Sequence, residues 1–276
     1  MANATDYTTD DLMCACISRQ VQDGEVLGQG IATPLVAAGY LLAKHTHAPH
    51  VTFASAIGNV LCEKTAPLGL TRVEEYWLGQ ALYFMGFAQV ACDLLPTLTP
   101  KEFFRPAQVD PYGQFNNVAI GDYYHPRLRL PGCGGIADVT VFSPGVYLYV
   151  PSHSRAVFVE KLDFVSGLGV PTADRPGLRP GPRLLISELG VFDYVGGRMR
   201  LHSYHRGVTV EKIRQKTGFA LALDPDAHET PPPTVDEVRL LREVIDPLGI
   251  RELERMSGAQ RRPRLRQLVQ QERDRK

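Results

Sequence analysis

The spacing of apolar residues changes along the chain between a helical period and the alternation typical of strands, which predicts a mixed fold. Thr8 and Asp11 form a capping box ahead of the first apolar helical face, and Thr33-Pro34 supplies an N-cap followed by a first-turn proline. These signals predict, in order, a helix ending near 23, a strand at 25–30, a helix at 34–44 and a buried strand at 51–55. Strands that alternate with helices in this way indicate an α/β sheet with parallel members.

The rest of the chain is expected to add further helices and short strands. Gly196-Gly197 predicts a hairpin turn, and Thr209 and Thr234 each predict a helix start. The apolar runs predict a helix at 72–94 and strands at 103–104, 138–142, 146–150, 156–159, 183–187, 191–194 and 199–202. We expect one α/β domain over residues 1–250 and a charge-rich tail, frayed or peripheral and helical, over residues 251–276.

The segment from Gln108 to Gly135 is the strongest candidate for a functional site. It holds a tight-turn sequence at 110–113 and the loop Gly132-Cys133-Gly134-Gly135, with little regular periodicity between them. Glycine-rich backbone can approach a ligand closely and present bare N–H groups to it. Long irregular segments in compact proteins usually carry function, so we expect the site in this segment.

Composition narrows the class of protein. The 276 residues are 44% apolar, enough for a substantial core, and 30 basic side chains balance 30 acidic ones. This balance gives no electrostatic reason to expect nucleic acid or membrane partners. The chain has no run of about eighteen apolar residues and no signal-peptide pattern, so we expect a cytoplasmic protein. Its five cysteines lack zinc-type spacing and are expected to be reduced thiols.

Three histidines, His45, His47 and His50, lie close together in the sequence and superficially suggest a metal site. Pro49 interrupts their geometry and no carboxylate lies within the cluster. We therefore expect no metal site.

The same candidate segment carries a family resemblance. Residues 107–116 read Ala-Gln-Val-Asp-Pro-Tyr-Gly-Gln-Phe-Asn, followed by Ile120-Gly121-Asp122-Tyr123, His125-Pro126 and the G-x-G-G loop. This ordered series resembles the β-type subunit of family I CoA-transferases, the glutaconate CoA-transferase group in particular. The similarity extends from about Tyr7 to about Pro247.

The resemblance implies a single-domain family I CoA-transferase fold, an open mixed or parallel sheet flanked by helices. It also implies a homologous α-type partner, commonly in an α2β2 assembly. The implied substrate is a coenzyme A thioester, with no permanently bound cofactor. Members of this family use a glutamate that attacks the thioester and carries the acyl and then the CoA group.

One position departs from the family pattern. In glutaconate-type sequences the glutamate ends the strand that follows an Ala-Pro pair, and here that position holds Ala56. Alanine cannot form an acyl or CoA intermediate. The first carboxylate downstream is Glu63, seven residues later, which is too far along the chain to occupy the same position. Relatives without the glutamate include a methylglutaconyl-type CoA decarboxylase and a ring-cleaving hydrolase of steroid catabolism. Ser55-Ala56-Ile57-Gly58 resembles the pattern of the decarboxylase more closely than a transferase signature.

The resemblance also assigns candidate site residues. The glycine loop implies an oxyanion-binding loop near the thioester, and Ala56 stands in place of the glutamate. The candidates are Gly132, Cys133, Gly134, Gly135 and Ala56 for catalysis, and Ser55, Ile57, Gly58, Gln108, Asn116 and Tyr123 for substrate binding. Each has a structural alternative: a plain connecting loop, amides that satisfy loop backbone, or aromatic packing. Cys133 is not favoured as a nucleophile, because the sequence shows no histidine partner for it.

Three functions remain open from the sequence. The leading hypothesis is an enzyme subunit that decarboxylates a carboxylated acyl-CoA or hydrolyses one of its C–C bonds. A true acyl-CoA:carboxylate CoA-transferase subunit, with a carboxylate from Glu63 or the partner, is the first alternative. A non-catalytic structural subunit is the second.

Overall fold

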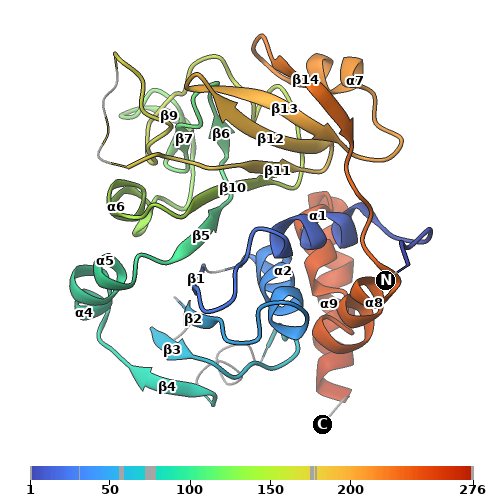
Figure 1. The fold of residues 1–276 in the computed structure, drawn as a ribbon. Helices are drawn as coiled ribbons and strands as arrows, with labels where there is room; N and C mark the ends of the chain where they lie inside the picture. Colours follow the sequence, from blue (N-terminus) through green and yellow to red (C-terminus); the bar gives the residue numbers. More distant parts are fainter. Residues whose placement is uncertain are drawn as a thin grey trace. The chain divides into compact units, whose positions relative to one another are not determined.

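The chain folds into two compact units (Figure 1). The structure, a computed structural model, describes residues 2–30, 32–55, 59–71, 79–174, 177 and 179–274. Unit 1 comprises Met1–Cys92 with Pro231–Lys276, and unit 2 comprises Asp93–Thr230.

Unit 1 combines a small mixed sheet with helices from both ends of its sequence. Its strands lie in the order β1-β2-β3-β4, with β1 and β2 parallel and the later pairs antiparallel. The strands are β1 (Val26–Gln29), β2 (Thr52–Ser55), β3 (Val60–Cys62) and β4 (Ala81–Phe84). The helices are α1 (Thr9–Ser18), α2 (Pro34–His45), α4 (Phe87–Gln89), α8 (Val235–Arg239) and α9 (Gly258–Asp274). The parallel β1–α2–β2 unit confirms the predicted alternation.

Local sequence chemistry accounts for the helix starts in unit 1. The capping boxes at Thr8 and Thr234 are both present, with the side chains of Asp11 and Glu237 returning to the N-cap backbone. The helices α1 and α2 approach closely at Gly39, where a Cβ atom would lie 2.6 Å from Cγ2 of Ile17. Only glycine fits there, because any side chain would push the two helices apart.

The structure corrects the helix predicted over residues 72–94. Residues 72–78 lie outside the described part, and the strand β4 covers Ala81–Phe84. Among the described residues of this range, the helical ones form α4 and a π-helical turn at Val90–Leu94. Leu82, Tyr83 and Phe84 are bulky residues that suit an extended strand, and pairing with β3 decides between the two periods.

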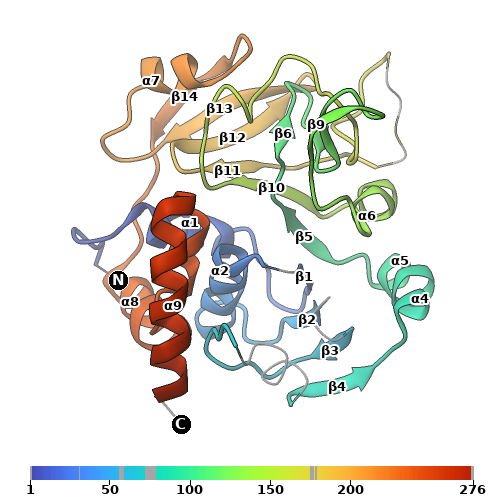
Figure 2. The ribbon, with the colours of Figure 1, turned by 180° about the vertical axis from the view of Figure 1, so that it is seen from behind.

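The described residues after 250 belong to unit 1 and are largely helical. Ile250–Glu254 is a 3-10 helix, and α9 runs along the outside of the helices of this unit (Figure 2). Leu268 of α9 is fully buried and joins a small apolar cluster. That cluster contains Leu248, Ile250 and Leu253, with Leu68, Leu70, Met256 and Leu265 packed against it. The predicted helix is therefore present, and its anchoring is tighter than a frayed tail.

Unit 2 is built on a longer mixed sheet. Its strands lie in the order β14-β13-β12-β11-β10-β5. Their bounds are β5 (Lys101–Phe104), β10 (Val146–Val150), β11 (Leu185–Ser187), β12 (Gly190–Val195), β13 (Arg198–Tyr204) and β14 (Ala222–Glu229). The pairs β5–β10, β10–β11 and β13–β14 are parallel, whereas β11–β12 and β12–β13 are antiparallel. The sequence prediction of an α/β class with a mixed sheet is confirmed.

Smaller elements complete unit 2. These are the helices α5 (Leu95–Leu98), α6 (Ile136–Phe142) and α7 (Val210–Lys216), and the strand pairs β6 (Gln108–Val109) with β7 (Phe115–Asn116), and β8 (Ala119–Gly121) with β9 (Pro126–Arg129). Two strand predictions were wrong. Residues 138–142 belong to α6, whose Val139 packs into the core, and residues 156–159 make only isolated bridges. Tertiary packing outweighs the β-propensity of the valines in α6.

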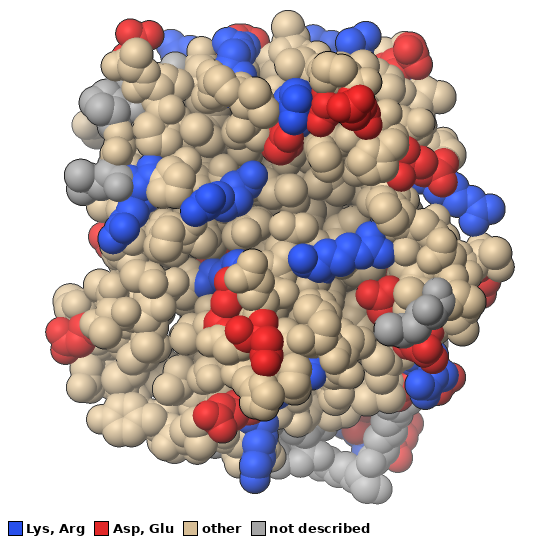
Figure 3. Space-filling model, in the orientation of Figure 1, with Lys and Arg blue, Asp and Glu red and all other residues tan. Residues whose placement is uncertain are grey.

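The face of the molecule that Figure 3 shows carries both basic and acidic side chains. Basic and acidic side chains are interspersed there with neutral surface, in keeping with equal numbers of both charges. Within the described residues, no helix combines the length and the apolar character needed to cross a bilayer.

Candidate functional site

The predicted tight turn at the start of the candidate segment is present between β6 and β7. One carboxylate oxygen of Asp110 accepts hydrogen bonds from the N–H groups of Tyr112 and Gln114, each at 2.9 Å. The N–H of Gly113 closes the turn on the Asp110 carbonyl at 3.1 Å. This turn sets the register in which Gln108 faces Asn116 across the strand pair.

Gln108 and Asn116 form a buried amide pair rather than an open polar surface. The Asn116 side-chain nitrogen donates to Gln108 Oε1 at 2.8 Å and to the Ala119 carbonyl at 2.7 Å. Gln108 Nε2 in turn donates to Asp163 Oδ2 at 2.9 Å, and the same oxygen accepts the N–H of Gly121 at 3.1 Å. Both amides therefore have the structural role considered above. Their hydrogen bonds fix the backbone of β8 at Ala119 and, through Asp163, at Gly121.

Asp163 and Ser166 are parts of this framework that the sequence did not single out as site residues. The backbone N–H of Asp163 donates to Gln108 Oε1, and the Ser166 hydroxyl accepts the N–H of Asn117 at 3.0 Å. Their separation in sequence from the turn hid this role. The family resemblance spans this region and includes the run Lys161-Leu162-Asp163, which is the only signal that could have drawn attention to one of them.

Tyr123 lies at the exposed tip of the β8–β9 hairpin. The residue is 42% exposed, and its ring stacks on Phe164 with 5.1 Å between ring centroids. The guanidinium carbon of Arg129 lies 5.0 Å from the Tyr123 ring centroid, and Tyr124 meets the ring edge-on. Tyr123 thus packs against its neighbours while keeping a face accessible.

The glycine loop follows the same hairpin and leads directly into α6. The N–H of Gly132 donates to the Asn117 carbonyl at 3.0 Å, and the Cys133 carbonyl accepts from Ile136 at 2.7 Å. These two bonds fix both ends of the loop. They also tie it to the framework of Gln108 and Asn116, because Asn117 is the next residue in the chain.

Three consecutive N–H groups in this loop have no acceptor among the described residues. They belong to Cys133, Gly134 and Gly135, where Gly134 is left-handed with φ +46°. A Cβ atom on Gly134 or Gly135 would meet no atom of the described residues within 4 Å, so these residues leave space beside the loop. Successive free N–H groups around a left-handed residue form a concavity suited to a negatively charged oxygen.

The remaining candidates belong to unit 1. Ser55 is the last residue of β2 and is buried, with 3% exposure. Ala56, Ile57 and Gly58 lie outside the described residues. Two of the three histidines considered for a metal have different partners. His47 Nε2 lies 3.0 Å from the Val21 carbonyl, and His50 Nδ1 pairs with Asp23 at 2.7 Å.

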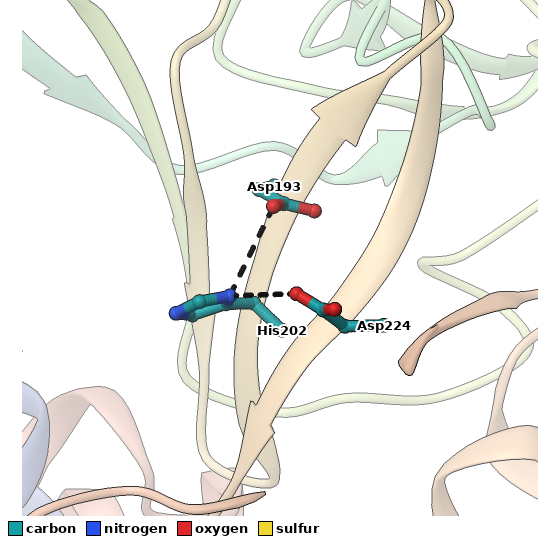
Figure 4. A group of neighbouring side chains, drawn as sticks. All are labelled: Asp193, His202 and Asp224. Atoms are coloured by element: carbon teal, nitrogen blue, oxygen red, sulfur yellow. Dashed lines mark hydrogen bonds and ion pairs between the residues drawn. The ribbon is translucent and has the colours of Figure 1, made fainter. Parts of the chain in front are cut away.

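One group of side chains in unit 2 has metal-ligating composition, namely Asp193, His202 and Asp224 on neighbouring strands (Figure 4). His202 Nδ1 lies 3.2 Å from Asp224 Oδ2 and 3.9 Å from Asp193 Oδ2. The Arg200 guanidinium binds both carboxylates, at 2.6 Å from Asp193 and 3.0 Å from Asp224. Arg200 already supplies the positive charge that these carboxylates require, and a cation would have to displace it.

Comparison with known proteins settles the family. The coenzyme A transferase family model matches residues 96–216. The chain is also 30% identical over 263 residues to the B-type subunit of glutaconate CoA-transferase from Acidaminococcus fermentans, covering 90% of this chain and 96% of that protein. The chain belongs to the coenzyme A transferase family. The glycine loop lies within the matched residues, as do Gln108, Asn116 and Tyr123.

Family members with other activities are equally similar. The IpdB subunit of the cholesterol ring-cleaving hydrolase of Rhodococcus jostii is 31% identical over 239 residues, which is 84% of this chain and 89% of that protein. The crystal structure of the decarboxylase AibA/AibB superposes with a TM-score of 0.79 at 28% identity, covering 90% of this chain and 98% of the matched one. These matches confirm the predicted coenzyme A transferase fold and the predicted group of relatives.

Proposed function

We propose that this chain is the B-type subunit of a two-subunit cytoplasmic enzyme that decarboxylates a carboxylated acyl-CoA of the glutaconyl type. The relatives named above are subunits of transferases, hydrolases or decarboxylases. The family therefore supports an enzyme, and the type of reaction has to be inferred from the residues of the site. The five free cysteines suit a reducing compartment.

The observation that carries the proposal is an oxyanion-binding loop without the family's nucleophile. Cys133, Gly134 and Gly135 offer three N–H groups without an acceptor in the described part of the chain, whereas the position of the transferase glutamate holds Ala56. A loop of this kind can stabilise an enolate, and a covalent acyl intermediate requires the missing carboxylate. Loss of the nucleophile together with retention of the loop favours chemistry on a thioester that stays intact.

Decarboxylation meets this requirement. The C–C bond to the substrate carboxylate breaks, carbon dioxide leaves, and the electron pair moves through the conjugated chain to the thioester oxygen. The N–H groups of the glycine loop stabilise the resulting dienolate oxygen by hydrogen bonds already oriented toward it. Protonation of the dienolate carbon then gives the shortened acyl-CoA and completes the balance of atoms and charge.

Hydrolytic C–C cleavage is the second candidate, favoured by the 31% identity to the IpdB protein. In that reaction, water adds to a β-keto carbon and the adjacent C–C bond breaks. The electron pair again becomes a thioester enolate, so the same loop serves both reactions. The two differ only in the leaving carbon fragment and in the consumption of water.

Product analysis of the assembled enzyme tests these alternatives. The chain would be purified with its A-type partner and incubated with glutaconyl-type and β-keto acyl-CoA substrates, with and without acetate. Loss of carbon dioxide without acetate, read by mass spectrometry, is the expected result. A product of the β-keto substrate that has gained one water would instead identify the reaction as C–C hydrolysis.

Two other outcomes would overturn the proposal. Acetyl-CoA formed only when acetate is present would show a CoA-transferase, and a hydroxylamine-trapped enzyme thioester would identify its carboxylate. Full activity of the A-type partner alone would make this chain a structural subunit.

A further inference from the structure

We propose that β4 and α4 form the surface on which the A-type partner docks, with the partner covering an apolar edge of unit 1. This inference rests on the proposed two-subunit enzyme and adds where on this chain the partner binds. We name this surface the β4 edge and define it by Leu82, Tyr83, Phe84 and Phe87.

The β4 edge exposes more apolar surface than a stable isolated chain normally leaves in one place. Leu82, Tyr83 and Phe84 are consecutive and exposed by 58%, 54% and 58%. Phe87 at the start of α4 is exposed by 69%. Tyr83 and Phe84 are consecutive paired residues and point to opposite faces, so the exposure of both shows that neither face of β4 is covered there by the described residues. Contiguous apolar patches of this kind mark interaction surfaces.

The backbone of β4 is also placed for pairing. This strand lies at the end of its sheet, where it pairs with β3. Exposed edges are usually protected by charged side chains, prolines or bulges that turn away other strands. Residues 79–92 contain neither a charged residue nor a proline. One irregularity is present: between Leu61 and Cys62 the register skips Leu82, which is therefore the extra residue on β4.

The chemistry of this segment selects the kind of partner. A charge-free apolar strip offers nothing to nucleic acid or to a phosphorylated ligand, and it matches the apolar centre of a permanent protein–protein interface. The A-type protein is the partner favoured here, because the matched decarboxylase is a two-subunit protein, AibA/AibB, and this chain matches 98% of one of its chains. A second copy of this chain is the competing occupant.

Charge insertion tests the location. We expect the double variant Phe84→Asp/Phe87→Asp to weaken binding of the purified A-type partner at least about 30-fold, the loss typical of an interface hot spot. The control is Val195→Asp in unit 2, which is exposed by 54% and is expected to leave affinity unchanged within about threefold. Both variants should keep the thermal unfolding of the isolated wild-type chain, since their side chains are already exposed.

Hydrogen exchange of the wild-type chain provides an independent measurement. Amides over residues 81–87 should exchange more slowly in the complex than in the isolated chain. An unchanged affinity of the double variant, or unchanged exchange in this segment, would overturn the proposal. Self-association of the wild-type chain that the double variant abolishes, with A-type binding intact, would assign the edge to a second copy instead.

Assembly and turnover are separate readouts. A wild-type complex that forms through the β4 edge and releases no carbon dioxide would remove the proposed reaction and leave the docking surface standing. A complex of the double variant that forms and releases carbon dioxide normally would remove the docking surface and leave the proposed reaction standing.

Discussion

At the scale of single residues, the glycine loop separates backbone function from side-chain function. Its useful groups are N–H donors of Cys133, Gly134 and Gly135, which no alanine substitution can remove. Only proline lacks the N–H, and its ring fixes φ near −65°. Gly135 has φ −87°, close enough for proline, and none of the described residues lies within 4 Å of a Cβ placed there.

Replacing Gly135 by proline should therefore remove one donor with little change of backbone. Gly135→Pro is expected to lower kcat/KM by about 10²–10³-fold, the cost of losing one oxyanion donor. Gly135→Ala keeps the donor, and we expect it to retain activity within a few-fold. Steady-state kinetics of the assembled enzyme distinguish the two. Equal activity of both variants would show that this N–H does not contact the reacting oxygen.

The side chain of Cys133 offers a second residue-scale prediction. In the proposed mechanism this residue contributes its N–H, and the thiol takes no part. Cys133→Ala should thus keep kcat/KM within a few-fold of wild type, measured with the same substrate. A loss of several orders of magnitude would instead assign the thiol a nucleophilic role.

At the scale of elements, a buried ion-pair network attaches the C-terminal 3-10 helix to α1. Arg251 is 4% exposed and binds Asp11 at 2.7 Å and Asp246 at 2.9 Å, both fully buried. Burial opposes ionisation of Asp11, but hydrogen bonds from Thr8, Arg242 and Arg251 outweigh it and lower the pKa of this carboxyl. The N-terminal and C-terminal parts of unit 1 are thereby joined.

Removing Arg251 should be strongly destabilising, because two carboxylates would stay buried with less positive charge beside them. We expect Arg251→Ala to lower the free energy of unfolding by about 3–5 kcal/mol. The control is Arg239→Ala, whose ion pair with Asp236 is exposed on both sides and contributes about 0–1 kcal/mol. Urea denaturation measures both. Equal midpoints would mean that the network contributes no net stability.

The limits of sequence reasoning are also clearest at this scale. Capping boxes and turn sequences depend on residues three or four apart, and the helix starts at Thr8, Thr33 and Thr234 were predicted correctly. Thr33 itself makes no capping bond, because Glu254 accepts the N–H of Leu35 at 2.9 Å. Such a contact joins residues 219 positions apart, and periodicity carries no trace of it.

The candidate site shows the same division. The glycine loop was identified because its residue types are themselves the signal for free N–H groups. Asp163, which ties Gln108 to Gly121, has no local signature. The charge-rich composition of residues 251–276 suggested a peripheral tail, since sequence cannot show that Arg251 and Glu272 are buried by partners elsewhere in the chain. Glu272, for example, accepts the N–H groups of Leu70 and Thr71.

At the scale of the whole molecule, stability should fall in mild acid because unit 2 buries a neutral histidine. His153 is 1% exposed, lies flat on Phe158 with 3.6 Å between ring centroids, and has both ring nitrogens near hydroxyls. Those hydroxyls are Ser187 Oγ at 3.1 Å and Thr217 Oγ1 at 3.0 Å. Burial, assisted by the charge of Lys216, lowers the pKa of His153 to about 3.

The sign of the pH dependence follows from proton binding. Below about pH 6.5 the unfolded chain binds a proton at this histidine, whereas the folded chain stays neutral until the pH approaches its much lower pKa. The stability from His153 is therefore complete above about pH 6.5 and is lost as the pH falls toward 3. Between pH 8 and pH 4.5 this one group should remove about 2.5 kcal/mol from the free energy of unfolding.

Comparing variants across pH isolates this contribution from every other titrating group. The glutamine of His153→Gln cannot titrate. Its poorer packing lowers the free energy of unfolding by the same amount at every pH, so the slope of stability against pH still reports the histidine alone. Wild type should lose about 2.5 kcal/mol more than His153→Gln between pH 8 and pH 4.5, by urea denaturation at each pH. The exposed His125→Gln serves as the control for replacing a histidine outside the core. Parallel profiles for His153→Gln and wild type would mean that the folded chain binds a proton at His153 as readily as the unfolded chain, with a rearrangement of Ser187 and Thr217 accommodating its charge.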